Sequence, residues 1–185
     1  AWVLGFAGLS LLMLVPLLFM LSTSIKYEQD VYEYPIRLIP ASVTFEHYVD
    51  LFTRPGVPML RWFFNSAYIT FMVTGLVLLI DSLTAFGFSR LDIPYKRPLF
   101  ILVIASMMIP FPTTLIPVYV FLQQLHWIDT YKALIIPPLA APFGVFLLRQ
   151  FFDTVPKELE EAAIIDGCSA FGVYWHVILP VSKSV

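Results

Sequence analysis

Long uncharged stretches alternate with short charged segments along the chain, and this alternation predicts membrane-spanning helices. The first 25 residues contain no charged side chain, and about 20 apolar residues suffice for a helix to cross the hydrocarbon core of a bilayer. We expect spans at about residues 2–21, 65–86, 99–122 and 133–152. The pattern therefore predicts an all-α fold, a polytopic transmembrane helical bundle with about four spans.

The polar segments between the spans predict their orientation. Residues 26–61 form a charged, proline-rich aqueous loop with a short helix expected over 44–52, where Thr44 could be the N-cap. A much shorter loop carries the basic residues Arg90, Lys96 and Arg97. Basic residues concentrated in a short loop favour the cytoplasmic side. Counting crossings from that loop places residues 153–180 in the cytoplasm.

One carboxylate, Asp81, interrupts the second predicted span. A carboxylate at the centre of a membrane helix costs roughly 2.5–3.5 kcal/mol on insertion scales. One interpretation is a proton or cation site. The interpretation that we favour is a carboxylate near the interface that reaches water or a partner such as Arg90.

The third predicted span contains three prolines between residues 110 and 117. Proline removes a helical hydrogen bond and clashes with the preceding turn, so we expect a bend or local unwinding here. Irregular backbone at membrane depth packs against protein or lines a water-filled path. The alternative is a packing kink whose carbonyls are satisfied by the neighbouring threonines. The candidate pathway residues are Asn65, Pro110, Thr113 and Thr114.

Residues 153–180 form a charged island in an otherwise apolar chain. We expect a first helix with Pro156 in its first turn and Gly167 at its end. Ser169 can cap a second short helix, which Pro180 should end. The island carries clustered glutamates, and anionic headgroups would repel them, so docking into a groove of a soluble partner is favoured over lying on the bilayer.

Composition agrees with a membrane protein and excludes several functions. Charged residues make up 13% of the chain, against about 25% in a soluble domain. A net charge of −2 gives no basic excess for nucleic acid, and the single cysteine, Cys168, leaves no internal disulfide or cysteine metal site. No Gly-x-x-x-x-Gly-Lys-Ser/Thr phosphate-binding loop occurs in the sequence. The chain begins at Ala1 within an apolar run and stops without a polar end, so we expect it to be a fragment.

The island also resembles a known signature. Glu161-Ala162-Ala163, then Gly167, then Val177-Ile-Leu-Pro180 is similar to the EAA motif of the membrane subunits of bacterial ABC importers. The longer stretch 156–167 resembles carbohydrate-uptake permeases related to the smaller membrane subunit of the maltose importer. Cys168 stands where that family usually has alanine.

This resemblance implies a type I ABC importer permease fold with six spans, two of them missing here. It implies a multi-pass subunit of the bacterial cytoplasmic (inner) membrane that moves sugars or oligosaccharides and is not itself an enzyme. Its implied partners are ABC ATPase subunits that hold ATP and Mg, a second permease subunit (in a hetero- or homodimer), an extracytoplasmic solute-binding protein and the lipid bilayer. The chain itself would bind no cofactor and no metal.

In that family the EAA loop, here 155–180, docks into a cleft on the ATPase. Glu161 would meet the ATPase, the paired alanines would allow close approach, and Gly167 would set the bend. The implied coupling residues are Glu161, Ala162, Ala163, Asp166, Gly167, Leu179 and Pro180.

Two other functions are weighed against this one. An ion-coupled secondary transporter or channel would use Asp81 as its ion site. A membrane-embedded enzyme would need clustered catalytic groups, but the three histidines are scattered along the chain, so this function is the weakest of the three.

Overall fold

The computed structural model describes residues 2–32, 34–35 and 37–184, and within these ranges it contains helices, turns and loops but no strand. The chain divides into two compact units, one ending at Phe64 and the other beginning at Asn65. Each unit is described separately.

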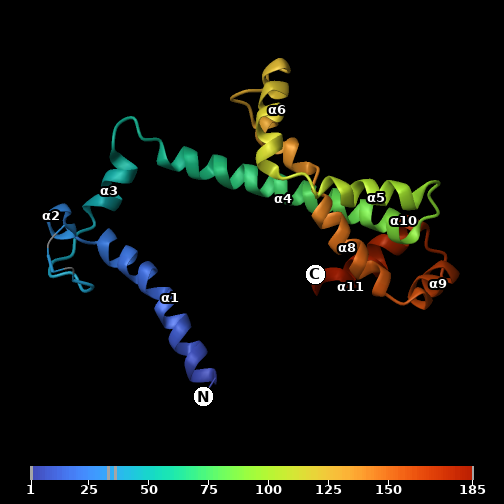
Figure 1. Cartoon of the computed structure of the whole chain (residues 1–185), viewed down its shortest axis with the longest axis horizontal. Helices are drawn as coiled ribbons and strands as arrows, with labels where there is room; N and C mark the ends of the chain where they lie inside the picture. The colour runs from blue at the N-terminus through green and yellow to red at the C-terminus, as the bar shows by residue number, and fades with distance from the viewer. Residues whose placement is uncertain (1, 33, 36, 185) are drawn as a thin grey trace. The chain divides into compact units, whose positions relative to one another are not determined.

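The first unit is a long apolar helix followed by a loop that folds back onto the end of that helix. The backbone N–H of Thr44 donates to the carbonyl of Ile25 at 2.9 Å, and the Tyr48 hydroxyl donates to Ser24 Oγ at 2.8 Å. The helix predicted over 44–52 is present over Glu46–Thr53, so it begins two residues and ends one residue later than predicted. Thr44 lies before this helix, and its hydroxyl oxygen accepts a hydrogen bond from the N–H of Glu46 at 3.2 Å. The helices of this unit are α1 (Trp2–Ser24), α2 (Glu28–Val31) and α3 (Glu46–Thr53), shown in Figure 1.

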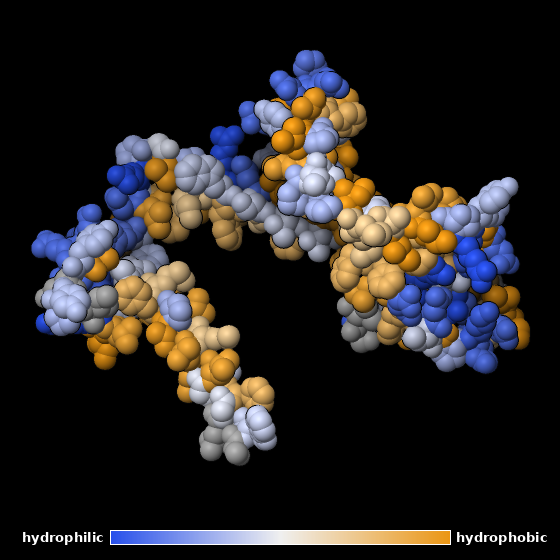
Figure 2. Space-filling view, in the orientation of Figure 1, coloured by the Kyte–Doolittle hydropathy of each residue, from blue (hydrophilic) through white to orange (hydrophobic). Residues whose placement is uncertain are grey.

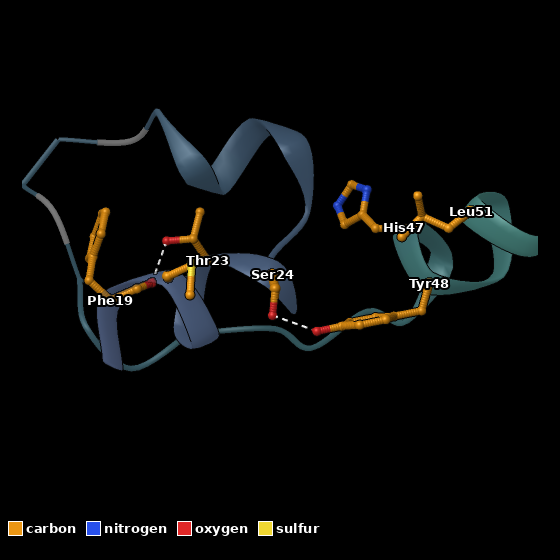
Figure 3. A pocket seen from close by; sticks show the side chains of 7 residues that line it. Phe19, Thr23, Ser24, His47, Tyr48 and Leu51 are labelled. Carbon is orange, nitrogen blue, oxygen red and sulfur yellow. Dashed lines mark hydrogen bonds between the residues drawn. The ribbon is translucent and has the colours of Figure 1, made fainter. Parts of the chain in front are cut away.

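A pocket of about 590 Å³ lies between the end of α1 and α3. Figure 3 shows the Tyr48 hydroxyl reaching Ser24 beside it, so this bond fixes α3 against the last turn of α1. The residues that line the pocket are Phe19, Met20, Thr23, Ser24, His47, Tyr48 and Leu51.

The second unit holds all the remaining helices. α4 (Met59–Arg90) begins in the first unit and supplies most of its length to the second. The others are α5 (Lys96–Ser106), α6 (Phe111–Gln124), α7 (Tyr131–Ile135), the 3₁₀ turn η1 (Pro137–Leu139), α8 (Pro142–Thr154), α9 (Lys157–Ile165), α10 (Ala170–Val173), the π-helical η2 (Tyr174–Ile178), α11 (Leu179–Val181) and η3 (Ser182–Ser184).

Among the described residues, α4 is the one helix long and apolar enough to cross a membrane by itself. Two pairs of consecutive helices could each form one bent span, which would raise the number of candidate spans to three. These bent pairs are α5 with α6, bent by 97°, and Tyr131–Leu139 with α8, bent by 40°. Within α1 (Trp2–Ser24), the apolar stretch Gly8–Ser24 lies in the described part of the helix. The four expected spans therefore remain a prediction.

Both bent pairs break at backbone that is not helical. Pro110 has φ −65° and ψ 133° and precedes α6, so the predicted irregularity is a complete break in the helix. Ala140 and Ala141, with ψ of 77° each, separate η1 from α8. In each case a proline follows within the first turn of the next helix, where its missing N–H costs nothing.

The core of the second unit joins three segments that are distant in sequence. Phe86 of α4, Phe152 of α8 and Tyr174 of η2 are at most 6% exposed and belong to one cluster. Burying an aromatic or large aliphatic side chain contributes about 1.5–3 kcal/mol. The predicted island is therefore packed against α4 and α8. The other members of the cluster are Ala85, Val155, Val173 and Ile178.

Two predicted boundaries of the island are wrong. Pro156 is the N-cap of α9, outside its first turn, and its ψ of 134° is extended. Pro180 lies inside α11 and does not end the helix. The reason is the π-helical turn before it: the N–H of Leu179 donates to the carbonyl of Tyr174. This wider turn accommodates a proline that would otherwise clash with the carbonyl four residues earlier.

Candidate functional site

The outward face of α9 is acidic and apolar. Glu161, Ala162 and Ile165 are all exposed, and Ile165 is 85% exposed. These residues recur at helical spacing, so they form one continuous surface. Figure 2 shows hydrophilic residues gathered on the part of the second unit where Figure 1 places α9.

The turn after α9 depends on a glycine. Gly167 has φ +88°, a conformation that side-chain-bearing residues rarely adopt. Its N–H donates to the carbonyl of Ile164, and the N–H of Cys168 donates to that of Ala163, each at 2.9 Å. The prediction that Gly167 ends this helix is confirmed. Ser169 then caps α10 as predicted, because its hydroxyl accepts from the N–H of Gly172 at 3.2 Å.

The inward face of α9 is fastened to α4. Arg90 Nε lies 2.6 Å from Glu160 Oε1, and the two side chains are only 7% and 14% exposed. The contact is an ion pair without a well-directed hydrogen bond between these two atoms. Ala163 also faces inward and packs against the core, whereas Ala162 is exposed. The two alanines of the motif therefore lie on different faces of the helix.

Arg90 also binds the end of α8. Its Nη2 donates to the carbonyls of Phe152 and Val155, each at 2.7 Å. Carbonyls at the C-terminal end of a helix carry partial negative charge and favour a cation there. One guanidinium therefore joins α4, α8 and α9, and we call this group the Arg90 clamp: Arg90, Glu160 and the carbonyls of Phe152 and Val155.

Two further bonds hold the island to α4. The hydroxyls of Ser82 and Tyr174 lie 2.8 Å apart in a buried position, and Ser89 Oγ donates to Asp153 Oδ1 at 2.5 Å. These contacts and the role of Glu160 in the clamp are not among the predictions from the sequence. A signal was present, because residues 82, 85, 86 and 89 recur at the spacing of one helix face.

The other implied coupling residues lie on the outside or edge of the same region. Asp166 follows α9 as its C-cap and is exposed. Leu179 packs against the core, and Pro180 is exposed.

The candidate pathway residues occupy two separate places. Asn65 Oδ1 accepts from the Tyr131 hydroxyl at 2.8 Å, which ties α4 to the start of α7. Thr113 Oγ1 donates to the carbonyl of Pro110 at 2.7 Å, and Thr114 Oγ1 to that of Phe111 at 2.9 Å. Both threonine hydroxyls thus satisfy backbone groups at the helix break, as the packing-kink alternative predicts.

The favoured interpretation of Asp81 is wrong. Its side chain is buried, with 2% of the residue exposed, so it does not lie at the protein surface, and Arg90 is engaged in the clamp. It lies against the start of α8, where a Cβ added to Gly144 would fall 2.0 Å from Asp81 Oδ2. Within the described part of the chain, no group of three or more His, Cys, Asp or Glu side chains could hold a metal ion.

Residues 83–185 match a protein family described as the binding-protein-dependent transport system inner membrane component. The chain is 32% identical over 185 residues to the arabinooligosaccharides transport system permease protein AraQ of Halalkalibacterium halodurans, covering 98% of this chain and 66% of AraQ. It is 32% identical over 170 residues to the sulfoquinovosyl glycerol transport system permease protein SmoH of Agrobacterium fabrum, covering 91% of this chain and 59% of SmoH.

A solved structure has the same fold. A chain of a bacterial ABC transporter involved in the import of the acidic polysaccharide alginate matches with a TM-score of 0.80 and 23% identity, covering 98% of this chain and 63% of that chain. The present chain spans just under two thirds of the length of the AraQ protein that it matches.

Proposed function

Because the chain belongs to the family of binding-protein-dependent transport system inner membrane components, we propose that it is the permease subunit of an ATP-driven ABC importer for sugars or oligosaccharides. The relatives named for arabinooligosaccharides and sulfoquinovosyl glycerol support the substrate class. The match to a chain of a bacterial ABC transporter supports this proposal over an ion-coupled transporter.

The proposed partners follow from the family. ABC ATPase subunits would bind and hydrolyse ATP with Mg, a second permease subunit would complete the pathway, and a solute-binding protein would deliver the cargo. The chain would lie in the cytoplasmic membrane, with α1, α4 and the two bent pairs as its four spans. The relatives' greater length supports six spans in the whole permease.

We assign the coupling role to α9 because its two faces differ. Its outward face offers Glu161, Ala162 and Ile165 to a partner, while its inward face is held by the Arg90 clamp. This is the observation that carries the proposal: a small exposed helix anchored to two longer ones. A displacement of α9 by the ATPase would then be transmitted to α4 and α8.

The test is transport by the complete importer in proteoliposomes, with ATP hydrolysis measured in parallel. Glu161→Lys places a cation on the docking face, and because like or mismatched charges at an interface cost several kcal/mol, we expect ATP-driven uptake to fall about tenfold or more. The matched control is Asp92→Lys, the same kind of charge change at an exposed loop residue outside the island.

Uptake by Glu161→Lys equal to that of the control would contradict the docking role of α9. Uptake by the unaltered importer that continues without the ATPase would contradict ATP-driven transport itself, and would favour the ion-coupled alternative.

A further inference from the structure

A buried carboxylate with one unpartnered oxygen lines a cavity in the second unit. Asp81 is 2% exposed, and its Oδ1 has no hydrogen-bond partner among the residues that the structure describes. The cavity has a volume of about 250 Å³. Its lining residues are Ile80, Asp81, Val103, Ser106, Leu139, Ala140, Ala141, Pro142 and Val145.

Two helix breaks meet at this cavity. Ser106 is the last residue of α5, directly before the break that leads to α6. Ala140 and Ala141 form the second break, between η1 and α8. Non-helical backbone at membrane depth occurs where it is buried in protein or lines a cavity, and there its carbonyl oxygens can serve as ligands.

The cavity carries one negative charge and no positive side chain among its lining residues. Two arginines on the helices that supply its walls, Arg90 of α4 and Arg149 of α8, are engaged elsewhere. Arg90 is in the clamp, and Arg149 lies 3.6 Å from Asp153 and over the ring of Phe100 at 3.7 Å. An uncompensated buried charge is costly, so a ligand that neutralises the Asp81 carboxylate would stabilise the fold.

The backbone holds this carboxylate in place. A Cβ at residue 144 would lie 2.0 Å from Asp81 Oδ2, so only glycine permits the close approach of α8 to Asp81. Gly144 lies in the first turn of α8, and the positive end of a helix favours a nearby anion. The position of the Asp81 carboxylate is therefore fixed by the first turn of α8.

We propose that this cavity binds a monovalent metal cation, Na⁺ or K⁺. Asp81 supplies the neutralising charge, and the Ser106 hydroxyl oxygen and the carbonyls of the 140–141 break supply further oxygen ligands. Hard cations prefer such oxygens. The volume corresponds to roughly eight water molecules at about 30 Å³ each, which leaves room for a partly hydrated ion.

A sugar fits this cavity less well than an ion. Its walls are aliphatic apart from Asp81 and Ser106, and no aromatic ring lines it to stack on a sugar face. The bound ion is a resident of the fold and does not drive transport, so this inference is independent of the proposed function.

The experiment measures thermal unfolding of the full-length permease in its purified complex, with NaCl or KCl replacing choline chloride at constant ionic strength. Choline is too large for a dehydrated oxygen site. We expect a saturable rise in the midpoint with Na⁺ or K⁺, corresponding to about an 11-fold rise in the folded-to-unfolded ratio at ten times the dissociation constant. Asp81→Asn removes the charge with little change in size, and should abolish the cation dependence while raising the midpoint in choline.

Gly144→Ala keeps the charge but displaces the carboxylate, so it should also lose the cation dependence. If the complex with Asp81→Asn does not assemble, Gly144→Ala tests whether the cation dependence requires the Asp81 carboxylate. The control Asp92→Asn removes an exposed carboxylate and should keep the full dependence. Equal midpoints of the unaltered complex in all three salts would overturn the proposal, as would cation dependence that survives in Asp81→Asn. Loss of ATP-driven uptake has no bearing on either result.

Discussion

Replacing Arg90 by alanine should release the island from the rest of the second unit. The guanidinium makes two hydrogen bonds of 2.7 Å to the carbonyls of Phe152 and Val155 and an ion pair of 2.6 Å with Glu160. Each hydrogen bond to a charged group contributes about 1.5–3 kcal/mol. Removing one partner of a buried pair costs about 3–5 kcal/mol, because the other charge is left without compensation. These terms overlap, so we expect a total of about 3–5 kcal/mol.

Hydrogen exchange of the backbone amides in α9 and its following turn measures this release directly. In the full-length permease, a loss of about 3–5 kcal/mol corresponds to exchange that is roughly a hundred to several thousand times faster. Arg90→Lys keeps the charge but replaces the planar fork by one ammonium, so we expect an intermediate effect. Glu160→Gln keeps both carbonyl contacts, and should have the smallest effect of the three.

The control is Arg97→Ala, which removes an exposed basic residue from the same loop region and should leave exchange in α9 unchanged. Exchange in α9 that is the same in Arg90→Ala and Arg97→Ala would refute the clamp. A double-mutant cycle of Arg90→Ala with Glu160→Gln should give an interaction energy of about 0.5–3 kcal/mol if the two groups act together.

Three further changes test the anchoring of the island. Tyr174→Phe removes the partner of the buried Ser82 hydroxyl and should lower the free energy of unfolding by about 1 kcal/mol in a denaturant titration, whereas the same change combined with Ser82→Ala should cost less than the sum. Gly167→Ala forces a side chain into φ +88° and should cost about 1–2 kcal/mol in the same titration. Ser169→Ala removes the cap of α10 and should speed exchange of the Gly172 amide by an amount equivalent to about 1 kcal/mol.

The sequence correctly predicted the helix ends of the island that depend on the chemistry of a single residue. Gly167 and Ser169 act at the positions expected for them, because a positive φ and a capping hydroxyl are properties of single residues. Pro180 did not follow its local rule. A π-helical turn accommodates it, and that turn contains Tyr174 and Ile178, which are fixed by packing against α4 and α8. Tertiary contacts of this kind are absent from a local pattern.

The orientation of α9 likewise depends on long-range contacts. Glu158, Glu160 and Glu161 look equivalent in the sequence, and the spacing alone does not reveal which of them faces the protein. The structure turns Glu160 inward because Arg90, 70 positions earlier in the sequence, lies beside it. The same rotation separates Ala162 from Ala163, so the side chain that a docking partner meets is that of Ala162.

The separate environments of Asp81 and Arg90 follow from helix geometry. Nine residues separate them on α4, which corresponds to about 13.5 Å along the axis and a rotation of about 180° at 3.6 residues per turn. The two side chains therefore leave the helix on opposite sides and cannot pair. Ser82 and Ser89, seven residues apart, lie within about 20° of each other, on a face about 90° from both Asp81 and Arg90, and both contact the island. Arg90 and the two serines thus anchor the island, while Asp81, opposite Arg90 on α4, lies at the helix breaks. A change that loosens the clamp should therefore leave the Asp81 cavity unaltered, and a change in the cavity should leave the exchange of α9 unaltered.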